Sequence, residues 1–397
     1  MSDTQKNKKP NVPNLRFPGF EGEWESRMVG KDCSVQMCKR IFANQTSEQG
    51  DIPFFKIGTI GGQPDAFISK ELFEEYKKKY SYPRKGEVMI TCAGTVGKTI
   101  VFDGDDAYFQ DSNIVWLSNP KQLYINSFLN YFLSRVNWNK LNSTTITRIY
   151  NDNLRNLVIN FPSVKEQEKI VALLSLIDSR IAIQNKVIED LKKLKTALCV
   201  KLFMHGRTIT TSIADIGEYF STDNLSKEDL TDYGAECVLY GELFTTYGRV
   251  ITDVKSRTLK KINNESSISN SNDLLFPAST TVDAISLISP AAITKPGVIL
   301  GGDMFGIRLN TNYNNQYMSN LLYYCYREKL ASYAQGSTIT HLHYKDIESI
   351  KIKVHAKENQ NAIAAILALQ DTRIANEQQI AKACMHLKAF LISQMFI

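Results

Sequence analysis

The chain reads STTITRIYNDNL at residues 143–154 and STITHLHYKDI at residues 337–347. Aligning Thr145 with Thr338 sets an offset of 193 residues, and this offset runs without a gap to the end of the sequence. Under it, Gln167 meets Gln360 and the stretch DSRIA at residues 178–182 meets DTRIA at residues 371–375. Polar positions, apolar positions and a loop all match together, so the chain contains an internal repeat. The sequence predicts one structural plan used twice.

The repeat divides each half into a variable part and a constant part. The match extends upstream from YINSFLNYFL at residues 124–133, which meets YMSNLLYYCY at residues 317–326, and it fades before about residue 120 of each half. Short apolar segments bounded by Gly, Pro, Asn and Asp predict strands in the variable parts, at residues 52–58, 87–92, 98–102, 113–117, 274–278, 298–300 and 305–309. A helix is expected near residues 124–138. The sequence therefore predicts a mixed α/β (α+β) fold, present twice.

The constant part is a long helix in each half. Residues 163–204 contain no Pro or Gly, and their apolar positions alternate in steps of four and three, which is typical of a coiled coil. Its seam contains Ile170, Leu174, Ile177, Ile181, Gln184, Ile188, Leu191, Lys195, Leu198 and Leu202. The later copy keeps the phase but places Gln370, Glu377 and Lys388 in it. We expect two rods of roughly 58 Å that pair antiparallel, with pseudo-twofold symmetry and a globular domain at each end.

This plan predicts four segments. They are a first domain at residues 1–162, a central helix at 163–204, a second domain at 205–355 and a C-terminal helix at 356–397. Two helices that pack separately beside their own domains remain the alternative to paired rods.

Composition narrows the class of protein. A chain of 397 residues with 43% hydrophobic residues forms about two or three folded domains. It has no apolar run of about 18 residues and no signal-peptide pattern, so we expect a cytoplasmic protein. Seven cysteines without paired spacing predict reduced, mostly buried thiols. The net charge of +6 permits a nucleic-acid partner without requiring one.

Two motifs resemble catalytic sites. CAGTVGKTI, which starts at Cys92, ends like a phosphate-binding loop, but Gly94 and Gly97 enclose two residues where that loop needs four. It is either a plain turn or a backbone-phosphate contact in which Lys98 supplies a cation. Asp65, Glu75 and Lys77 imitate a metal-dependent nuclease, although the charge-rich stretch around Glu75 also fits a solvated helix face. We find no catalytic constellation and no metal site.

The Ser/Thr loops carry the functional signal. They supply hydroxyls, cations and rings, which can donate hydrogen bonds to phosphates and base edges. A helix N-cap ahead of Asp152 and Asp346 is the structural alternative, because caps use the same residue types. A metal pair formed by His341 and His343 would lack a third ligand.

Taken together, these features resemble the specificity subunit of type I restriction-modification systems. The resemblance rests on the repeat, on the opening LRFPGFEGEWESRMVG and on the GTVGKT and STxITxL stretches, and it covers essentially the whole chain. It implies two target-recognition domains that read an asymmetric, bipartite DNA site, with the paired helices setting the distance between its halves. Such a chain is not itself an enzyme.

The same resemblance implies partners. Two methyltransferase subunits would bring S-adenosylmethionine, and restriction/translocase subunits would use ATP and Mg²⁺. The candidate DNA-binding residues of this chain are Lys56, Thr95, Lys98, Thr144, Thr145, Thr147, Arg148, Tyr150, Tyr240, Thr280, Thr281, Ser337, Thr338, Thr340, His341 and His343. The counterpart of GTVGKT in the second half is ASTTVDA at residues 278–284, so the role of Lys98 does not carry over.

Two alternatives stay open. A self-contained Mg²⁺-dependent nuclease would use Asp65, Glu75 and Lys77 and would cut plasmid without partners. A free-standing bivalent DNA-binding repressor would have no reason to co-purify with a methyltransferase.

Overall fold

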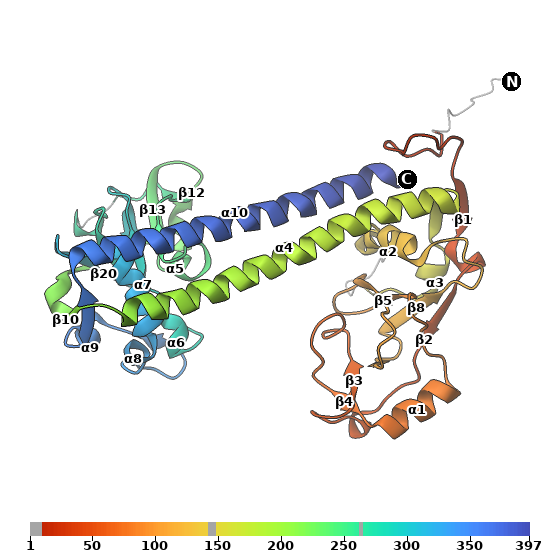
Figure 1. Cartoon of the computed structure of the whole chain (residues 1–397), viewed down its shortest axis with the longest axis horizontal. Helices are drawn as coiled ribbons and strands as arrows, with labels where there is room; N and C mark the ends of the chain where they lie inside the picture. The colour runs from red at the N-terminus through yellow and green to blue at the C-terminus, as the bar shows by residue number, and fades with distance from the viewer. Residues whose placement is uncertain (1–9, 142–147, 262–264) are drawn as a thin grey trace. The chain divides into compact units, whose positions relative to one another are not determined.

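The computed structural model describes residues 10–141, 148–261 and 265–397. The described chain forms two compact units, residues 1–183 with 380–397 and residues 184–379. Each unit holds one mixed α/β domain and parts of both long helices, α4 (Val164–Met204) and α10 (Lys357–Met395) (Figure 1). The predicted mixed α/β fold and both predicted long helices are confirmed. The division into four segments at residues 162, 204 and 355 stays a prediction.

The domain of the first unit contains two small sheets. A four-stranded antiparallel sheet has the order β2 (Ser34–Met37), β8 (Ile114–Ser118), β5 (Val88–Thr91) and β6 (Thr99–Val101). A three-stranded sheet has the order β4 (Phe67–Ile68), β3 (Ile52–Phe55) and β7 (Tyr108–Phe109). The further elements are the pair β1 (Glu25–Met28) and β9 (Val158–Phe161), and the helices α1 (Lys70–Lys79), α2 (Asn126–Ser134) and α3 (Asn151–Arg155).

The domain of the second unit contains two larger sheets. A five-stranded sheet has the order β11 (Gly217–Ser221), β20 (Met304–Leu309), β16 (Asp273–Pro277), β18 (Ala291–Ile293) and β14 (Val250–Ile251). A four-stranded sheet has the order β12 (Leu230–Thr231), β15 (Ser256–Thr258), β13 (Ala235–Leu239) and β19 (Ile299–Gly301). Two pairs complete it, β10 (Thr208–Ser212) with β22 (Lys351–His355) and β17 (Ser279–Thr280) with β21 (Thr340–His341).

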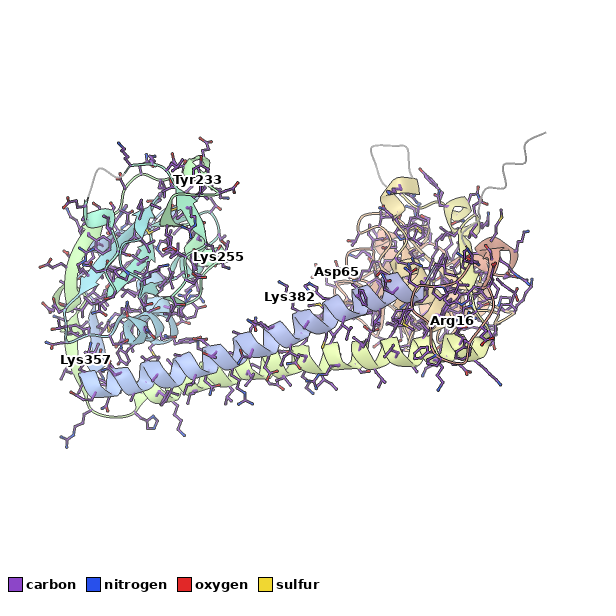
Figure 2. All side chains as sticks on the ribbon, turned by 90° about the horizontal axis from the view of Figure 1, so that it is seen from above. Arg16, Asp65, Tyr233, Lys255, Lys357 and Lys382 are labelled. Atoms are coloured by element: carbon purple, nitrogen blue, oxygen red, sulfur yellow. The ribbon has the colours of Figure 1, made fainter. Side chains whose placement is uncertain are left out.

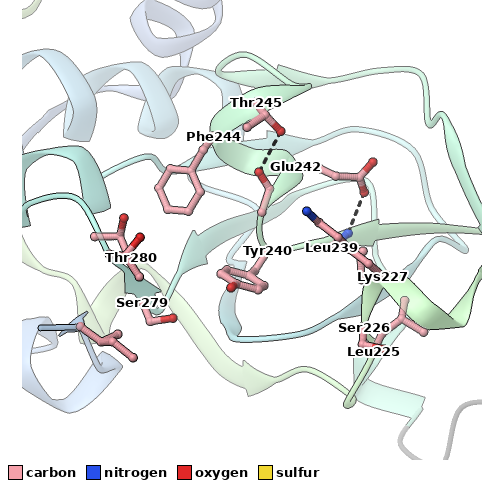
Figure 3. A pocket seen from close by; sticks show the side chains of 13 residues that line it. Leu225, Ser226, Lys227, Leu239, Tyr240, Glu242, Phe244, Thr245, Ser279 and Thr280 are labelled. Carbon is pink, nitrogen blue, oxygen red and sulfur yellow. Dashed lines mark hydrogen bonds between the residues drawn. The ribbon is translucent and has the colours of Figure 1, made fainter. Parts of the chain in front are cut away.

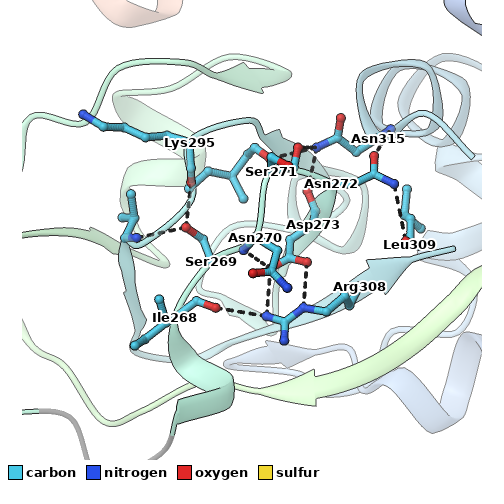
Figure 4. A network of polar contacts seen from close by, with 12 residues as sticks. Ile268, Ser269, Asn270, Ser271, Asn272, Asp273, Lys295, Arg308, Leu309 and Asn315 are labelled. Atoms are coloured by element: carbon cyan, nitrogen blue, oxygen red, sulfur yellow. Dashed lines mark hydrogen bonds and ion pairs between the residues drawn. The ribbon is translucent and has the colours of Figure 1, made fainter. Parts of the chain in front are cut away.

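Short helices connect the strands of this second domain. They are α5 (Glu242–Thr245), α6 (Ala284–Leu287), α7 (Asn315–Cys325), α8 (Arg327–Ala331) and α9 (Tyr344–Ile347). A buried polar network fixes the central strands. Asp273 is fully buried and accepts hydrogen bonds from Arg308, while Asn315 at the start of α7 donates to the carbonyl oxygens of Asp273 and Ile293 (Figure 4). Arg308 supplies the donors that the buried carboxylate needs, and the bonds from Asn315 to main-chain carbonyl oxygens hold the start of α7 against the sheet.

The two long helices pair antiparallel within each unit. In the first unit Lys388 Nζ of α10 lies 2.5 Å from Asp178 Oδ1 of α4. In the second unit Lys195 Nζ of α4 lies 2.5 Å from Asp371 Oδ1 of α10. Under the 193-residue offset Asp178 corresponds to Asp371 and Lys195 corresponds to Lys388, so the two ion pairs are equivalent. Pseudo-twofold symmetry requires such an equivalence. Direct pairing replaces the alternative of two separately packed helices.

The predicted seam faces the partner helix. All ten predicted seam positions of α4 are buried or half-buried, including the polar Gln184 and Lys195. Gln184 donates to the carboxylate of Glu377, which is its own counterpart in the repeat. A residue that meets its own counterpart lies at the centre of a twofold-related helix pair.

A buried glutamine fastens each domain to its long helix. Gln167 of α4 donates to the carbonyl oxygens of Leu123 and Pro162, both at 2.9 Å, and accepts from the Ile125 N–H at 2.8 Å. Gln360 of α10 has the same role, donating to Asn312 and His355 and accepting from the Asn314 N–H at 2.9 Å. Arg16 adds an ion pair of 2.8 Å with Glu166 beside the start of α4 (Figure 2).

The structure gives a different correspondence between the starts of α2 and α7 than the sequence alignment does. Ile125 and Asn314 precede α2 and α7 as equivalent residues, which makes the local offset 189 and not 193. Phe128 of α2 stacks on Phe396, and Tyr317 of α7 packs edge-on against Phe203, again 189 residues apart. Four residues are about one helical turn. At the start of these helices the gapless match of YINSFLNYFL to YMSNLLYYCY is therefore displaced by one turn, and such a shift leaves the same face inward. Its pairing of Tyr131 with Tyr324 still holds, because both rings lie beside equivalent lysines, Lys388 and Lys195.

Candidate nucleic-acid interface

Three segments of the first domain come together around the GTVGKT motif. The motif is the turn between β5 and β6, and Gly94 and Gly97 adopt φ values of +63° and +82°. A side chain at Gly97 would meet the ring of Trp138 at 2.1 Å, so both the backbone and the space require glycine there. The Lys98 ammonium donates to the Ile60 carbonyl at 2.5 Å, which ties the motif to the turn that follows Lys56.

The end of the first Ser/Thr loop adjoins this turn. The Ile149 N–H donates to the Cys92 carbonyl at 2.9 Å, so Arg148 and Tyr150 lie next to the GTVGKT motif. Burial raises the pKa of the Cys92 thiol to about 11, and the nearby Arg148 guanidinium opposes that rise. Tyr150 is 60% exposed. The predicted residues Thr144, Thr145 and Thr147 lie outside the described residues.

These contacts define a first candidate surface formed by Lys56, Thr95, Lys98, Arg148 and Tyr150. Thr95 is exposed, and Lys56 is half-exposed with an ion pair of 2.9 Å to Asp65. Lys98 braces the neighbouring turn through Ile60, and its side chain is exposed, so a phosphate contact stays a prediction. The surface presents cations, a hydroxyl and a ring, which suits contacts to a phosphate backbone and to base edges.

A second candidate surface forms around the second Ser/Thr loop. Strands β17 and β21 place Ser279 opposite His341 and Thr280 opposite Thr340, while reciprocal backbone bonds between Gln335 and His341 close the loop. Ser337, Thr338 and His343 are exposed at its edge, and the rings of His341 and His343 lie parallel with centroids 6.2 Å apart.

A pocket of about 400 Å³ opens beside these strands (Figure 3). Three of the candidate DNA-binding residues, Tyr240, Thr280 and Thr281, line it together with Ile339 of the loop. Lys227 and Glu242 also line it and were not anticipated, because nothing in the sequence links these residues to a loop about 100 positions later. Glu242 accepts from the Leu239 N–H at 2.8 Å and from Ser256 at 2.5 Å, so it shapes the pocket wall.

The capping alternative accounts for part of the Ser/Thr loops. Asp346 accepts from the His343 N–H at 2.9 Å at the start of α9, and Asn153 accepts from the Tyr150 N–H at 2.8 Å at the start of α3. These caps use the residues that follow each loop and leave the loop hydroxyls at Ser337 and Thr338 exposed. The caps therefore hold the loops in place without consuming their donors.

The residues of the nuclease alternative have other partners. Asp65 pairs with Lys56, and Lys77 lies 2.8 Å from Asp106, while Glu75 is exposed on α1. No group of three potential metal ligands occurs among the residues that the structure describes. In those same residues no helix is long and apolar enough to cross a bilayer, and all seven cysteines are free, five of them buried.

Comparisons with known proteins agree with the repeat. A model of the type I restriction modification DNA specificity domain matches the chain twice, at residues 21–193 and 209–383. A type I restriction enzyme specificity subunit of Haemophilus influenzae, S.HindORF215P, is 51% identical over 157 residues, a match that spans 40% of each chain. The MjaX specificity subunit of Methanocaldococcus jannaschii is 22% identical over a match that covers 95% of this chain and 94% of its own.

Solved structures share the fold. The S subunit of a type I restriction-modification system from M. genitalium aligns with a TM-score of 0.60 at 18% identity, over 97% of this chain and 99% of its own. A chain from a structural study of complex assembly and conformational transition in a type I system aligns with a TM-score of 0.58 at 14% identity, with the same coverage.

Proposed function

The chain belongs to the type I restriction-modification DNA specificity family, and on this premise we propose that it recognises a bipartite, asymmetric DNA target for partner subunits that carry the chemistry. One domain would read each half of the target. The observation that carries this proposal is the second Ser/Thr loop, which presents exposed hydroxyls at Ser337 and Thr338 and whose sequence is repeated in the first domain. Two domains that differ in sequence but share the repeated helices and loops are expected to recognise two different half-sites.

The proposed reading surfaces are the two candidate surfaces. In the first, Arg148 and Lys98 supply cations beside the exposed Tyr150 ring. In the second, exposed hydroxyls and two histidine rings border a pocket lined by Tyr240 and Thr280. Arginine, hydroxyl and imidazole groups donate to the acceptors that bases and phosphates display in DNA grooves.

Exposed leucines on the long helices support docking of two identical subunits. In the first unit Leu176 and Leu387 are 70% and 49% exposed, and they lie close in sequence to Asp178 and Lys388, which form an ion pair. In the second unit Leu369 and Leu194 are 70% and 53% exposed and stand at the equivalent positions beside the Asp371–Lys195 pair. Large exposed apolar side chains at repeated positions favour an interface. We propose that one methyltransferase subunit docks on each.

Catalysis would then belong to the partners. We propose that methyltransferase subunits bring S-adenosylmethionine and that restriction/translocase subunits bring ATP and Mg²⁺, while this chain supplies recognition without catalysis. We propose that the complex acts in the cytoplasm, where it would meet DNA.

Methylation mapping tests the proposal. The chain is expressed with its cognate methyltransferase subunit in a host without other adenine methylation, and modified adenines are sequenced. We expect one split recognition sequence. Arg148→Ala should relax one half of it and His343→Ala the other, since each base or phosphate contact is worth about 1 to 3 kcal/mol.

The two variants are each other's controls. Methylation that depends on the chain but occurs at a single unsplit sequence contradicts the two-domain reading. A variant that weakens both halves equally shows that its residue is not a local reader.

A further inference from the structure

Three elements meet at one polar cluster in the first unit. Asp178 of α4 accepts a hydrogen bond of 2.7 Å from the Tyr131 hydroxyl of α2, and its other oxygen lies 2.5 Å from Lys388 Nζ of α10. The Lys388 ammonium also lies 5.3 Å from the centroid of the Tyr131 ring. Burial raises the pKa of Tyr131 to about 12, and its hydroxyl donates to Asp178. The first cluster, Tyr131, Asp178 and Lys388, thus joins the domain to both long helices.

A second cluster stands at the matching place in the second unit. Lys195 of α4 lies 2.5 Å from Asp371 of α10, and its ammonium is 5.9 Å from the centroid of the Tyr324 ring on α7. The lysine side chain is only 8% exposed. Counted from the start of its helix, Tyr324 lies one turn later in α7 than Tyr131 lies in α2, because α2 begins at Asn126 and α7 begins at Asn315. Tyr131 and Tyr324 nevertheless match each other under the 193-residue offset that relates the two ion pairs.

Each cluster is a second attachment point for its domain. The first attachment point is the buried glutamine, Gln167 in one unit and Gln360 in the other. Asp178 follows Gln167 by eleven residues and Asp371 follows Gln360 by eleven, which is about 16 Å along a helix. Apolar packing of each domain core on the long helices adds to these polar contacts, and two directed polar contacts at this separation restrict the tilt that apolar packing alone would tolerate.

We propose that the two tyrosine–aspartate–lysine clusters are positioning sites that set the tilt of each reading domain on the helix pair, and so the number of base pairs between the two half-sites. The inference rests on the proposed function. The clusters would act without touching DNA, through the domains that contact it.

The lever arm gives the size of the effect. A domain of this size extends about 20 Å from its attachment. A tilt of about 10° moves its far edge by about 3.5 Å, which is close to the rise of one base pair. Loss of a cluster should therefore change the permitted gap by about one base pair and leave the half-site sequences unchanged.

The test uses the full chain with its methyltransferase subunit. Lys388→Met removes the charge of the first cluster and keeps the length of the side chain, while Tyr131→Phe removes only its hydrogen bond to Asp178. Lys193→Met is the matched control, because Lys193 pairs with Glu189 on the exposed face of α4. Modified adenines are sequenced for each, and thermal unfolding is recorded in parallel.

We expect Lys388→Met, and to a smaller degree Tyr131→Phe, to methylate additional sites whose gap differs by one base pair while both half-sequences persist. Lys193→Met should keep the wild-type gap. An unchanged gap in both cluster variants overturns the inference, and so does a complete loss of methylation, which would give the clusters a role in folding or assembly. Failure of the wild-type chain to direct methylation at a split site would instead contradict the proposed function.

Discussion

Replacing Gln184 with glutamate should destabilise the helix pair at its centre. Gln184 is 2% exposed and donates to the carboxylate of Glu377, with its amide also 3.4 Å from the Glu377 carbonyl. Gln184→Glu removes this charge-assisted bond, which is worth about 1.5 to 3 kcal/mol. It also sets two carboxylates about 4 Å apart, which costs about 1 kcal/mol in water and about 4 kcal/mol at an effective dielectric of 20.

Both effects have the same sign, so we expect a loss of about 3 kcal/mol or more. At about 2 to 4 °C per kcal/mol for domains of this size, the unfolding transition that melts the helices should fall by about 6 to 12 °C. Circular dichroism at 222 nm follows that transition. At pH 4 a carboxyl that gains a proton can donate to the other, so the difference from wild type should shrink there.

Three variants isolate the cause. Glu377→Gln keeps an amide pair and should cost about 1 kcal/mol, since only the charge assistance is lost. The double variant Gln184→Glu with Glu377→Gln exchanges the two partners and should recover most of the loss. Gln378→Glu adds the same charge at an exposed position of α10 and should change little. If the exchange recovers nothing, the two side chains do not pair at the centre and the reasoning is refuted.

Two further changes test other parts of the molecule. Inserting seven residues after Lys186 and after Gln379 keeps the seam in phase and lengthens both helices by about 10 Å, so the methylated gap should widen by about three base pairs; an unchanged gap in the mapped sites excludes the helices as the ruler. Gly97→Ala should cost about 2 kcal/mol or more in thermal unfolding, because φ is +82° and the new carbon would meet Trp138 at 2.1 Å, and melting at the wild-type temperature would contradict that packing.

The sequence by itself determined the repeated architecture. Periodicity placed both long helices to within about two residues, because a long helix without Pro or Gly shows its buried seam as a pattern of fours and threes. It also placed several of the buried strands, such as β5 and β20, because a buried strand is a short apolar run between turn residues, but it missed the short and exposed strands. Antiparallel pairing followed from the order of domain and helix in the chain. These features are local or repeated, and they can therefore be predicted from the sequence alone.

The sequence predicted the two candidate surfaces only in part. The Ser/Thr loops and GTVGKT were found as motifs, but their adjacency in the first domain depends on one backbone bond from Ile149 to Cys92, across 57 positions. The sequence did not indicate that Lys227 and Glu242 line the pocket of the second domain, because the topology of the sheets brings them close to residues distant in sequence.

Only the tertiary structure decided the register between domain and helix. Tyr131 and Tyr324 meet equivalent lysines although α2 and α7 correspond with a shift of one turn. A shift of four residues preserves the apolar face and is invisible to periodicity. Hydrogen bonds of Gln167 and Gln360 fix this register. The repeat identified the two glutamines as equivalent, but the sequence did not predict their hydrogen-bond partners. Apolar burial is nearly indifferent to such a shift, whereas hydrogen bonds have distance and direction, and these exist only in three dimensions.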